Sequence, residues 1–144
     1  MYVSIDPGGR TGIAIFTPDG KDHTRQALTS DNFLLYLQSM ISMKDQKLIT
    51  AFIVEDFKLQ ENKALDLVGH DFIAPQMIGS VRLTAKILNV PIHYTYPRNL
   101  DTAFKWAGVK KPKGHPPDEI AAYVHGVYWL VDNKIRKHRI LEEA

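Results

Sequence analysis

Three acidic residues stand where apolar segments of the sequence end or begin. Asp6 follows the apolar residues 2–5, Glu55 follows residues 51–54, and Asp118 precedes a long segment with helical apolar spacing. A carboxylate beside a buried strand is unfavourable unless it is paired or bound to a metal ion. Three converging carboxylates repel one another, and a divalent cation removes that repulsion. Because every ligand atom would be oxygen, the pattern favours Mg²⁺ or Mn²⁺, the ions of phosphate chemistry.

A histidine accompanies the third acid. His115 lies three residues before Asp118, where it would serve as a metal ligand or a proton carrier. Each candidate also has an ordinary explanation, since His115 fits a plain loop residue and Asp118 fits a helix N-cap. Asp6 fits a turn residue that accepts backbone N–H bonds, and Glu55 fits a partner for a lysine at the strand end. The metal-site hypothesis therefore depends on all three acids occurring together in this order.

The elements that would position these residues follow from the spacing of apolar side chains. Short apolar runs predict strands over residues 2–5, 12–16, 48–57 and 92–96, with a weaker strand over 22–28. Helical spacing and capping residues predict helices over residues 30–43, 75–89, 99–106 and 118–136. An initial meander followed by alternating helices and strands is typical of a mixed sheet flanked by helices.

The size and composition restrict the kind of protein. The chain has 144 residues, about the length of one domain, and residues 1–144 show no linker or repeat, so we expect a single domain. The absence of cysteine excludes disulfides, thiolate zinc sites and a cysteine nucleophile. No apolar run approaches the roughly 20 residues of a membrane helix, and the first residues do not resemble a secretory signal. We therefore expect a cytoplasmic protein with no membrane partner.

The charge is distributed unevenly. The net charge is only +2, but the segment from Lys105 to Arg139 holds many lysines and arginines and few acids. A basic region of this kind is the usual electrostatic footprint for a phosphate backbone. A solvated helix face with a lysine-rich loop would give the same pattern, so charge alone leaves both interpretations open.

Three motifs resemble one known family in order and spacing. SIDPGGRTGIAIF around Asp6, IVE ending at Glu55, and HPPDEIA from His115 to Ala121 resemble the acidic motifs of the RuvC-like Holliday junction resolvases. The resemblance implies a ribonuclease-H-like α/β fold with a mixed five-stranded sheet. It also implies a crossover junction endodeoxyribonuclease with Asp6, Glu55, His115 and Asp118 as catalytic residues and metal ligands. Two Mg²⁺ or Mn²⁺ ions would activate water and stabilise the leaving oxygen, and the products would carry 5′-phosphates.

The resemblance further implies a homodimer that binds branched DNA, with the helix over residues 75–89 as the dimer face. The apolar pattern of that helix also fits a core helix. We expect the DNA contacts at five basic residues and one aromatic residue: Lys110, Lys111, Lys113, Arg98, Lys105 and Phe57. Phe57 also fits a core aromatic at a strand end. The chain is short, and the segment between Ala107 and His115 is abbreviated. In this the chain resembles the bacteriophage-encoded members, which would act in the host cytoplasm, and strict selectivity for four-way junctions is in doubt.

Three other functions remain open on the sequence. An Asp-x-Gly turn followed by a glycine-bearing strand also begins the phosphate-binding domains of sugar kinases and actin, although those proteins use two such domains. A non-catalytic protein that binds DNA structures would keep the fold without turnover. A broader branched-DNA or RNA–DNA hybrid nuclease would keep the same acids. Comparing ATP binding with cleavage of a junction, a flap and a hybrid would separate these possibilities.

Overall fold

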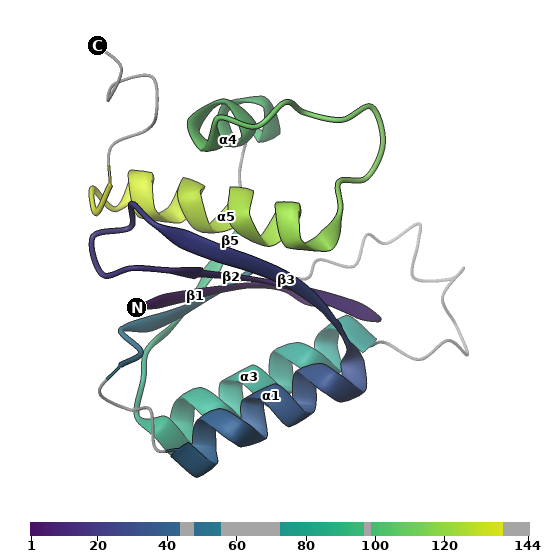
Figure 1. Cartoon of the computed structure of the whole chain (residues 1–144), viewed down its shortest axis with the longest axis vertical. Coiled ribbons are helices and arrows are strands. Elements are labelled where there is room, and N and C mark those ends of the chain that lie inside the picture. The colour runs from purple at the N-terminus through teal and green to yellow at the C-terminus, as the bar shows by residue number, and fades with distance from the viewer. Residues whose placement is uncertain (44–47, 56–72, 97–98, 137–144) are drawn as a thin grey trace.

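The computed structural model describes residues 1–43, 48–55, 73–96 and 99–136. A five-stranded sheet forms its centre, with helices on both faces (Figure 1), which confirms the predicted α/β class. The elements in chain order are β1 (Tyr2–Asp6), β2 (Arg10–Phe16), β3 (His23–Thr29), α1 (Ser30–Met43), β4 (Ala51–Glu55), α3 (Ile73–Leu88), β5 (Ile92–Thr95), α4 (Leu100–Ala107) and α5 (Asp118–Asp132). None of these described helices is long and apolar enough to cross a membrane.

The order of the strands brings two acidic positions together. The sheet runs β3-β2-β1-β4-β5, with antiparallel pairs on the β3 side and parallel pairs from β1 to β4 and from β4 to β5. In the parallel pair, Ile5 lies opposite Val54. The next residues along the two strands are Asp6 and Glu55, so both acids lie at the same edge of the sheet. This adjacency is a direct consequence of parallel pairing.

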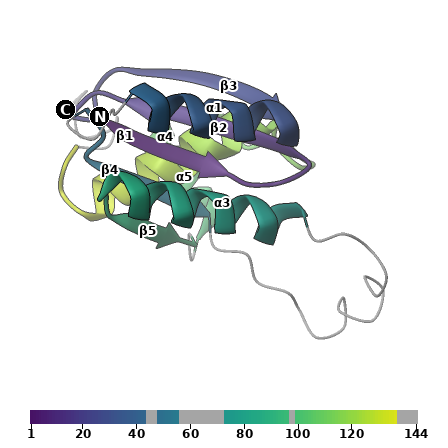
Figure 2. The ribbon, with the colours of Figure 1, turned by 90° about the horizontal axis from the view of Figure 1, so that it is seen from below.

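The two faces of the sheet are covered by different helices. Helices α1 and α3 pack on one face, and α5 with α4 outside it packs on the other (Figures 1 and 2). Successive strand residues point to opposite faces, so Val3 and Ile5 enter the core with α1 and α3. Ser4 points the other way and donates a hydrogen bond of 2.7 Å from its Oγ to the carbonyl oxygen of Ala122 on α5. By the same alternation Asp6 and Glu55 belong to the α5 face.

Small residues let α5 lie directly on the sheet. A Cβ atom at Gly126 would come within 2.6 Å of Phe16 Cε2 and 2.8 Å of Ser4 Cβ. A Cβ atom at Gly12 on β2 would overlap the main-chain carbonyl of Asp118. The first turn of α5 is therefore held against β2, close to the end of β1. Gly12 thus helps to place Asp118 near Asp6.

The ends of the elements follow local chemistry. Asn99 caps α4 by accepting a hydrogen bond from the Thr102 backbone N–H at 3.2 Å, and Gly108 ends the helix with φ at +69°, as the sequence predicted. Helix α3 ends before Asn89, which adopts a positive φ of 56°. Helix α5 is shorter than the predicted 118–136 because Lys134 has a φ of +60° and the helix stops at Asp132. The weakly predicted third strand is present as β3, largely exposed at the sheet edge.

Candidate active site

Asp6 is a buried carboxyl that faces other acids. Only 7 % of its surface is exposed, and its side chain is hydrogen-bonded to the Glu55 carboxyl. Burial, followed by this hydrogen bond and the negative charges of Glu55 and Asp118, raises the pKa of Asp6 from 3.8 to about 9. At neutral pH Asp6 therefore keeps its proton and donates it in the bond to Glu55. Its side-chain partner is an acid rather than a backbone N–H of the turn, which was the ordinary explanation.

Glu55 ends β4 and stands between two described partners. Its side chain is 29 % exposed, and Oε1 lies 3.6 Å from Nε2 of His125 on α5. The other partner is Asp6. In the described part of the chain no lysine forms an ion pair with Glu55, so the explanation by a lysine at the strand end is not supported. The Glu55 carboxyl is instead hydrogen-bonded to the Asp6 carboxyl at the sheet edge.

Asp118 is the first residue of α5, and its N-cap is Pro117, which makes no side-chain capping bond. The ordinary explanation of Asp118 as an N-cap is therefore wrong. A carboxylate in the first turn still interacts favourably with the helix dipole. Asp118 is close enough to Asp6 for its charge to raise the pKa of Asp6. The structure thus brings Asp6, Glu55 and Asp118 into one electrostatically coupled group.

This group suits a divalent cation in its chemistry, although it is not yet arranged around one. Among the described residues, no three His, Asp or Glu side chains already form a set that could hold a metal ion. Asp6 is nevertheless buried against two acids, and the donors are all oxygen, as Mg²⁺ and Mn²⁺ prefer. Binding of a cation would require Asp6 to lose its proton and the Asp6–Glu55 hydrogen bond to open.

His115 shares a cavity with Glu55, and its ring contacts the neighbouring backbone. It is exposed, and its Nδ1 lies 2.8 Å from the carbonyl oxygen of Pro116. His115 and Glu55 both line a cavity of about 240 Å³, and its other lining residues are Tyr96 and residues of α4, of α5 and of the loop between these two helices. His115 is therefore within the same hollow as a predicted metal ligand, and its role as a ligand or proton carrier stays a prediction.

His125 belongs to the site and was missed by the sequence analysis. It lies on α5 two turns after Asp118, lines the same cavity and contacts Glu55. A residue seven positions after a helical ligand returns to the same side of the helix, so the spacing between Asp118 and His125 was a signal. This signal was overlooked because the neighbouring residues of α5 are apolar and indicated a core helix.

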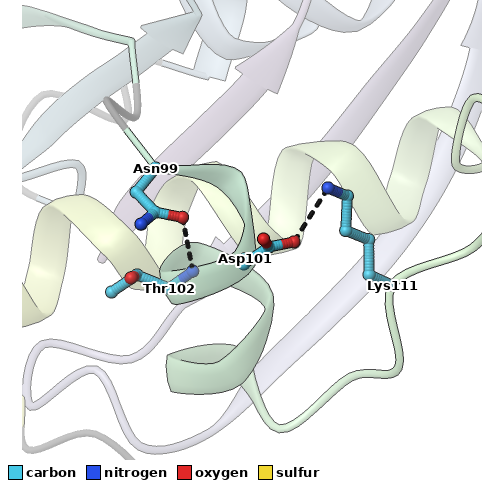
Figure 3. A network of polar contacts seen from close by, with 4 residues as sticks. All are labelled: Asn99, Asp101, Thr102 and Lys111. Carbon is cyan, nitrogen blue, oxygen red and sulfur yellow. Dashed lines mark hydrogen bonds and ion pairs between the residues drawn. The ribbon is translucent and has the colours of Figure 1, made fainter.

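The predicted DNA contacts are mostly accessible. Lys105, Lys110, Lys111 and Lys113 are exposed, whereas Phe57 and Arg98 lie outside the described residues. Lys111 forms an ion pair of 2.8 Å between its Nζ and Asp101 Oδ1, which links the loop to the first turn of α4 (Figure 3). Both side chains remain largely exposed, so the pair adds little stability. Lys111 also lines the cavity that Glu55 lines, which places one cation in the same cavity as a predicted metal ligand.

Comparisons with known proteins give structural matches alone. No protein-family model matches the sequence, and no curated protein matches it significantly. A structure described as T. thermophilus RuvC in complex with Holliday junction substrate matches with a TM-score of 0.60 and 12 % identity, over 95 % of this chain and 98 % of that one. A Thermus thermophilus RuvC structure matches with a TM-score of 0.59 and 15 % identity over the same shares. At such low identity the likeness shows the fold, which is that of RuvC and the ribonuclease-H-like proteins.

Proposed function

We propose that this protein is a metal-dependent, structure-selective endonuclease that cleaves Holliday junctions and other branched DNA. The observation that carries the proposal is the buried carboxyl of Asp6, whose pKa is raised to about 9 beside Glu55 and Asp118. A carboxyl whose pKa is strongly perturbed by burial and by neighbouring charges is a candidate for a functional site. The RuvC-like fold, seen in a neighbour that is bound to a Holliday junction, supports DNA as the substrate.

The chemistry assigned to the residues is phosphodiester hydrolysis. Two bound Mg²⁺ or Mn²⁺ ions would lower the pKa of the attacking water and stabilise charge on the leaving 3′-oxygen. Asp6, Glu55 and Asp118 would hold these ions. His115, in the adjoining cavity, would orient the water or accept its proton. Hydrolysis in this direction leaves a 5′-phosphate and a 3′-hydroxyl.

The proposed DNA path runs over the loop before α5. Lys110 and Lys113 are exposed there, and Lys105 is exposed on α4. Lys111 is the described lysine that reaches the cavity at Glu55. We assign it to a phosphate near the cleaved bond and the other lysines to flanking phosphates, which would anchor the backbone without reading sequence. Arg98 and Phe57 remain contacts proposed from the sequence.

A homodimer through α3 would present two such sites to one junction. Leu83 and Ile87 are exposed by 61 % and 47 %, one turn apart on the surface of α3. Gly79 continues this stripe, and a Cβ there would meet no atom of the described residues within 4 Å. A second helix can approach closely along such a stripe, and burying the two apolar side chains would favour association. Two active sites related by symmetry would nick opposing strands, in the cytoplasm of the cell or of a phage host.

Parallel cleavage assays test the proposal. Wild-type protein, Glu55→Gln and the surface control Asp132→Asn would be incubated with a four-way junction, a flap, a fork and an RNA–DNA hybrid, in Mg²⁺, Mn²⁺ or EDTA. We expect metal-dependent cleavage of the junction by the wild type and the control, and binding without cleavage by Glu55→Gln. If the protein cleaved the RNA–DNA hybrid in preference to the branched DNAs, the hybrid would be assigned as its substrate instead. Full activity of Glu55→Gln, or no cleavage of any substrate by the wild type, would contradict the proposal.

A further inference from the structure

His125 is a buried polar side chain for which the carboxylate chemistry has no assigned role. It lies in the middle of α5, where its neighbours Val124 and Val127 are buried and apolar, and only 7 % of its own surface is exposed. Its Nε2 lies 3.6 Å from Oε1 of Glu55. Helix α5 therefore places the His125 imidazole beside the carboxyl of Glu55, the residue that ends β4.

The position of the His125 ring favours a directed contact with Glu55. A neutral imidazole has one N–H donor and one acceptor nitrogen. Because a carboxyl faces Nε2, we assign the proton to Nε2. The present separation is slightly longer than a hydrogen bond, so a small movement of Glu55 would complete the bond.

The other ring nitrogen argues against a purely structural role. Nδ1 of His125 is buried, and no residue that the structure describes forms a hydrogen bond with it. A buried polar atom without a partner is unfavourable by about 1–3 kcal/mol, and such atoms are rare enough to need an explanation. Leucine at this position would fill the space within an apolar stretch of helix without that penalty. The histidine is therefore better explained by what it does to Glu55 than by packing.

Metal binding would change the partners of Glu55. In the structure the Glu55 carboxyl is hydrogen-bonded to Asp6, and that bond must open before both carboxyls can act as ligands. Among the described residues, His125 is then the remaining polar partner of Glu55. Hydrogen bonds to the ligands of a metal commonly fix their orientation, and losing one typically reduces metal affinity by about 10–100-fold.

We propose that His125 is a positioning residue that holds the Glu55 carboxylate in its ligand orientation by donating a hydrogen bond from Nε2. The inference rests on the proposed metal site and goes beyond it, because it names a residue outside the four that the sequence motifs supply. His125 touches neither DNA nor metal in this account. Its effect reaches the reaction only through Glu55.

The test compares variants that keep or remove the donor. His125→Leu removes it in a similar volume, and His125→Met does the same if the leucine variant does not fold. His125→Gln keeps an N–H donor near the position of Nε2. The matched control is His23→Phe, since His23 stacks on Tyr123 and pairs with Phe16 at the far end of the sheet. Mn²⁺ affinity would be measured by calorimetry on DNA-free protein, with urea unfolding in EDTA as the stability readout.

We expect His125→Leu to bind Mn²⁺ about 10–100-fold more weakly while it is at least as stable in EDTA as the wild type. We expect His125→Gln to recover most of the affinity and His23→Phe to leave it unchanged. In single-turnover cleavage the leucine variant should lose rate without losing affinity for the junction. Wild-type Mn²⁺ affinity in His125→Leu, or an equal loss in His125→Gln, would overturn the inference. If Glu55→Gln still abolished binding in that case, the metal site itself would stand. Failure of the wild type to bind Mn²⁺ would contradict both the proposed metal site and the role of His125.

Discussion

The raised pKa of Asp6 predicts that this carboxyl destabilises the metal-free protein at neutral pH. The pKa is 3.8 when the side chain is unperturbed and about 9 in the fold. At pH 7 the folded protein therefore holds a proton that the unfolded chain has released. One pH unit of such linkage corresponds to about 1.4 kcal/mol. Between pH 3.8 and pH 7, the free energy of unfolding therefore falls by up to about 4 kcal/mol relative to a protein with a non-ionising side chain at this position.

The change that isolates this effect is Asp6→Asn. The amide does not ionise and can still donate a hydrogen bond to Glu55. Measured in EDTA at pH 7, the variant should be about 1–4 kcal/mol more stable than the wild type. The sign follows from the raised pKa, because the stability that the protonated carboxyl provides is complete below pH 3.8 and is lost as the pH rises toward 9. The advantage of the variant should therefore grow from pH 5 to pH 8.5.

Urea unfolding at pH 5, 7 and 8.5 in EDTA is the assay, with Asp132→Asn as the control. Asp132 is exposed at the end of α5, so its replacement should change stability by less than about 0.5 kcal/mol at each pH. If Asp6→Asn were no more stable than the wild type at pH 7, or if its advantage did not depend on pH, Asp6 would ionise normally in the fold. The crowding of acids at the sheet edge would then be refuted.

Three further predictions concern the DNA surface, the packing of α5 and the dimer. Replacing the loop lysines with alanine (Lys110, Lys111 and Lys113) should weaken junction binding and reduce the slope of log K against log salt by about 2–3; an unchanged slope would remove them from the interface. Gly126→Ala should lower the free energy of unfolding by about 1–3 kcal/mol, because the added Cβ would lie 2.6 Å from Phe16; unchanged urea unfolding would show that α5 can move away. Leu83→Glu should convert a dimer into a monomer in light scattering, and an unchanged mass would place the dimer face elsewhere.

Much of the fold could be predicted because local chemistry and tertiary packing agree. The caps of α4 at Asn99 and Gly108 are strong local signals, and the structure follows both. The closeness of Asp6 and Glu55 was also predictable, since both end apolar strands and parallel strands share an edge. The third acid was a harder case. Asp118 lies close to Asp6 and Glu55 because Gly12 lets α5 pack directly against β2. No sequence pattern around Gly12 predicts that contact.

The features that the sequence analysis missed depend on contacts between distant segments. His125 appears in the sequence as one polar residue among apolar ones, and its significance arises from a strand end seventy residues earlier along the chain. The ion pair between Lys111 and Asp101 joins a loop to a helix terminus across ten residues. Exposed charges have many available partners, so sequence spacing does not select one. Both features were identified from interatomic distances in the structure and not from the spacing of residues in the sequence.

The most direct test of the central claim is the anomalous diffraction of Mn²⁺ in crystals of the wild-type protein. The account predicts Mn²⁺ bound by carboxylate oxygens of Asp6, Glu55 and Asp118, with the hydrogen bond between Asp6 and Glu55 broken, and no such signal in Glu55→Gln. If Mn²⁺ at a concentration that supports cleavage bound elsewhere and left these three side chains unoccupied, the proposed metal centre would be contradicted.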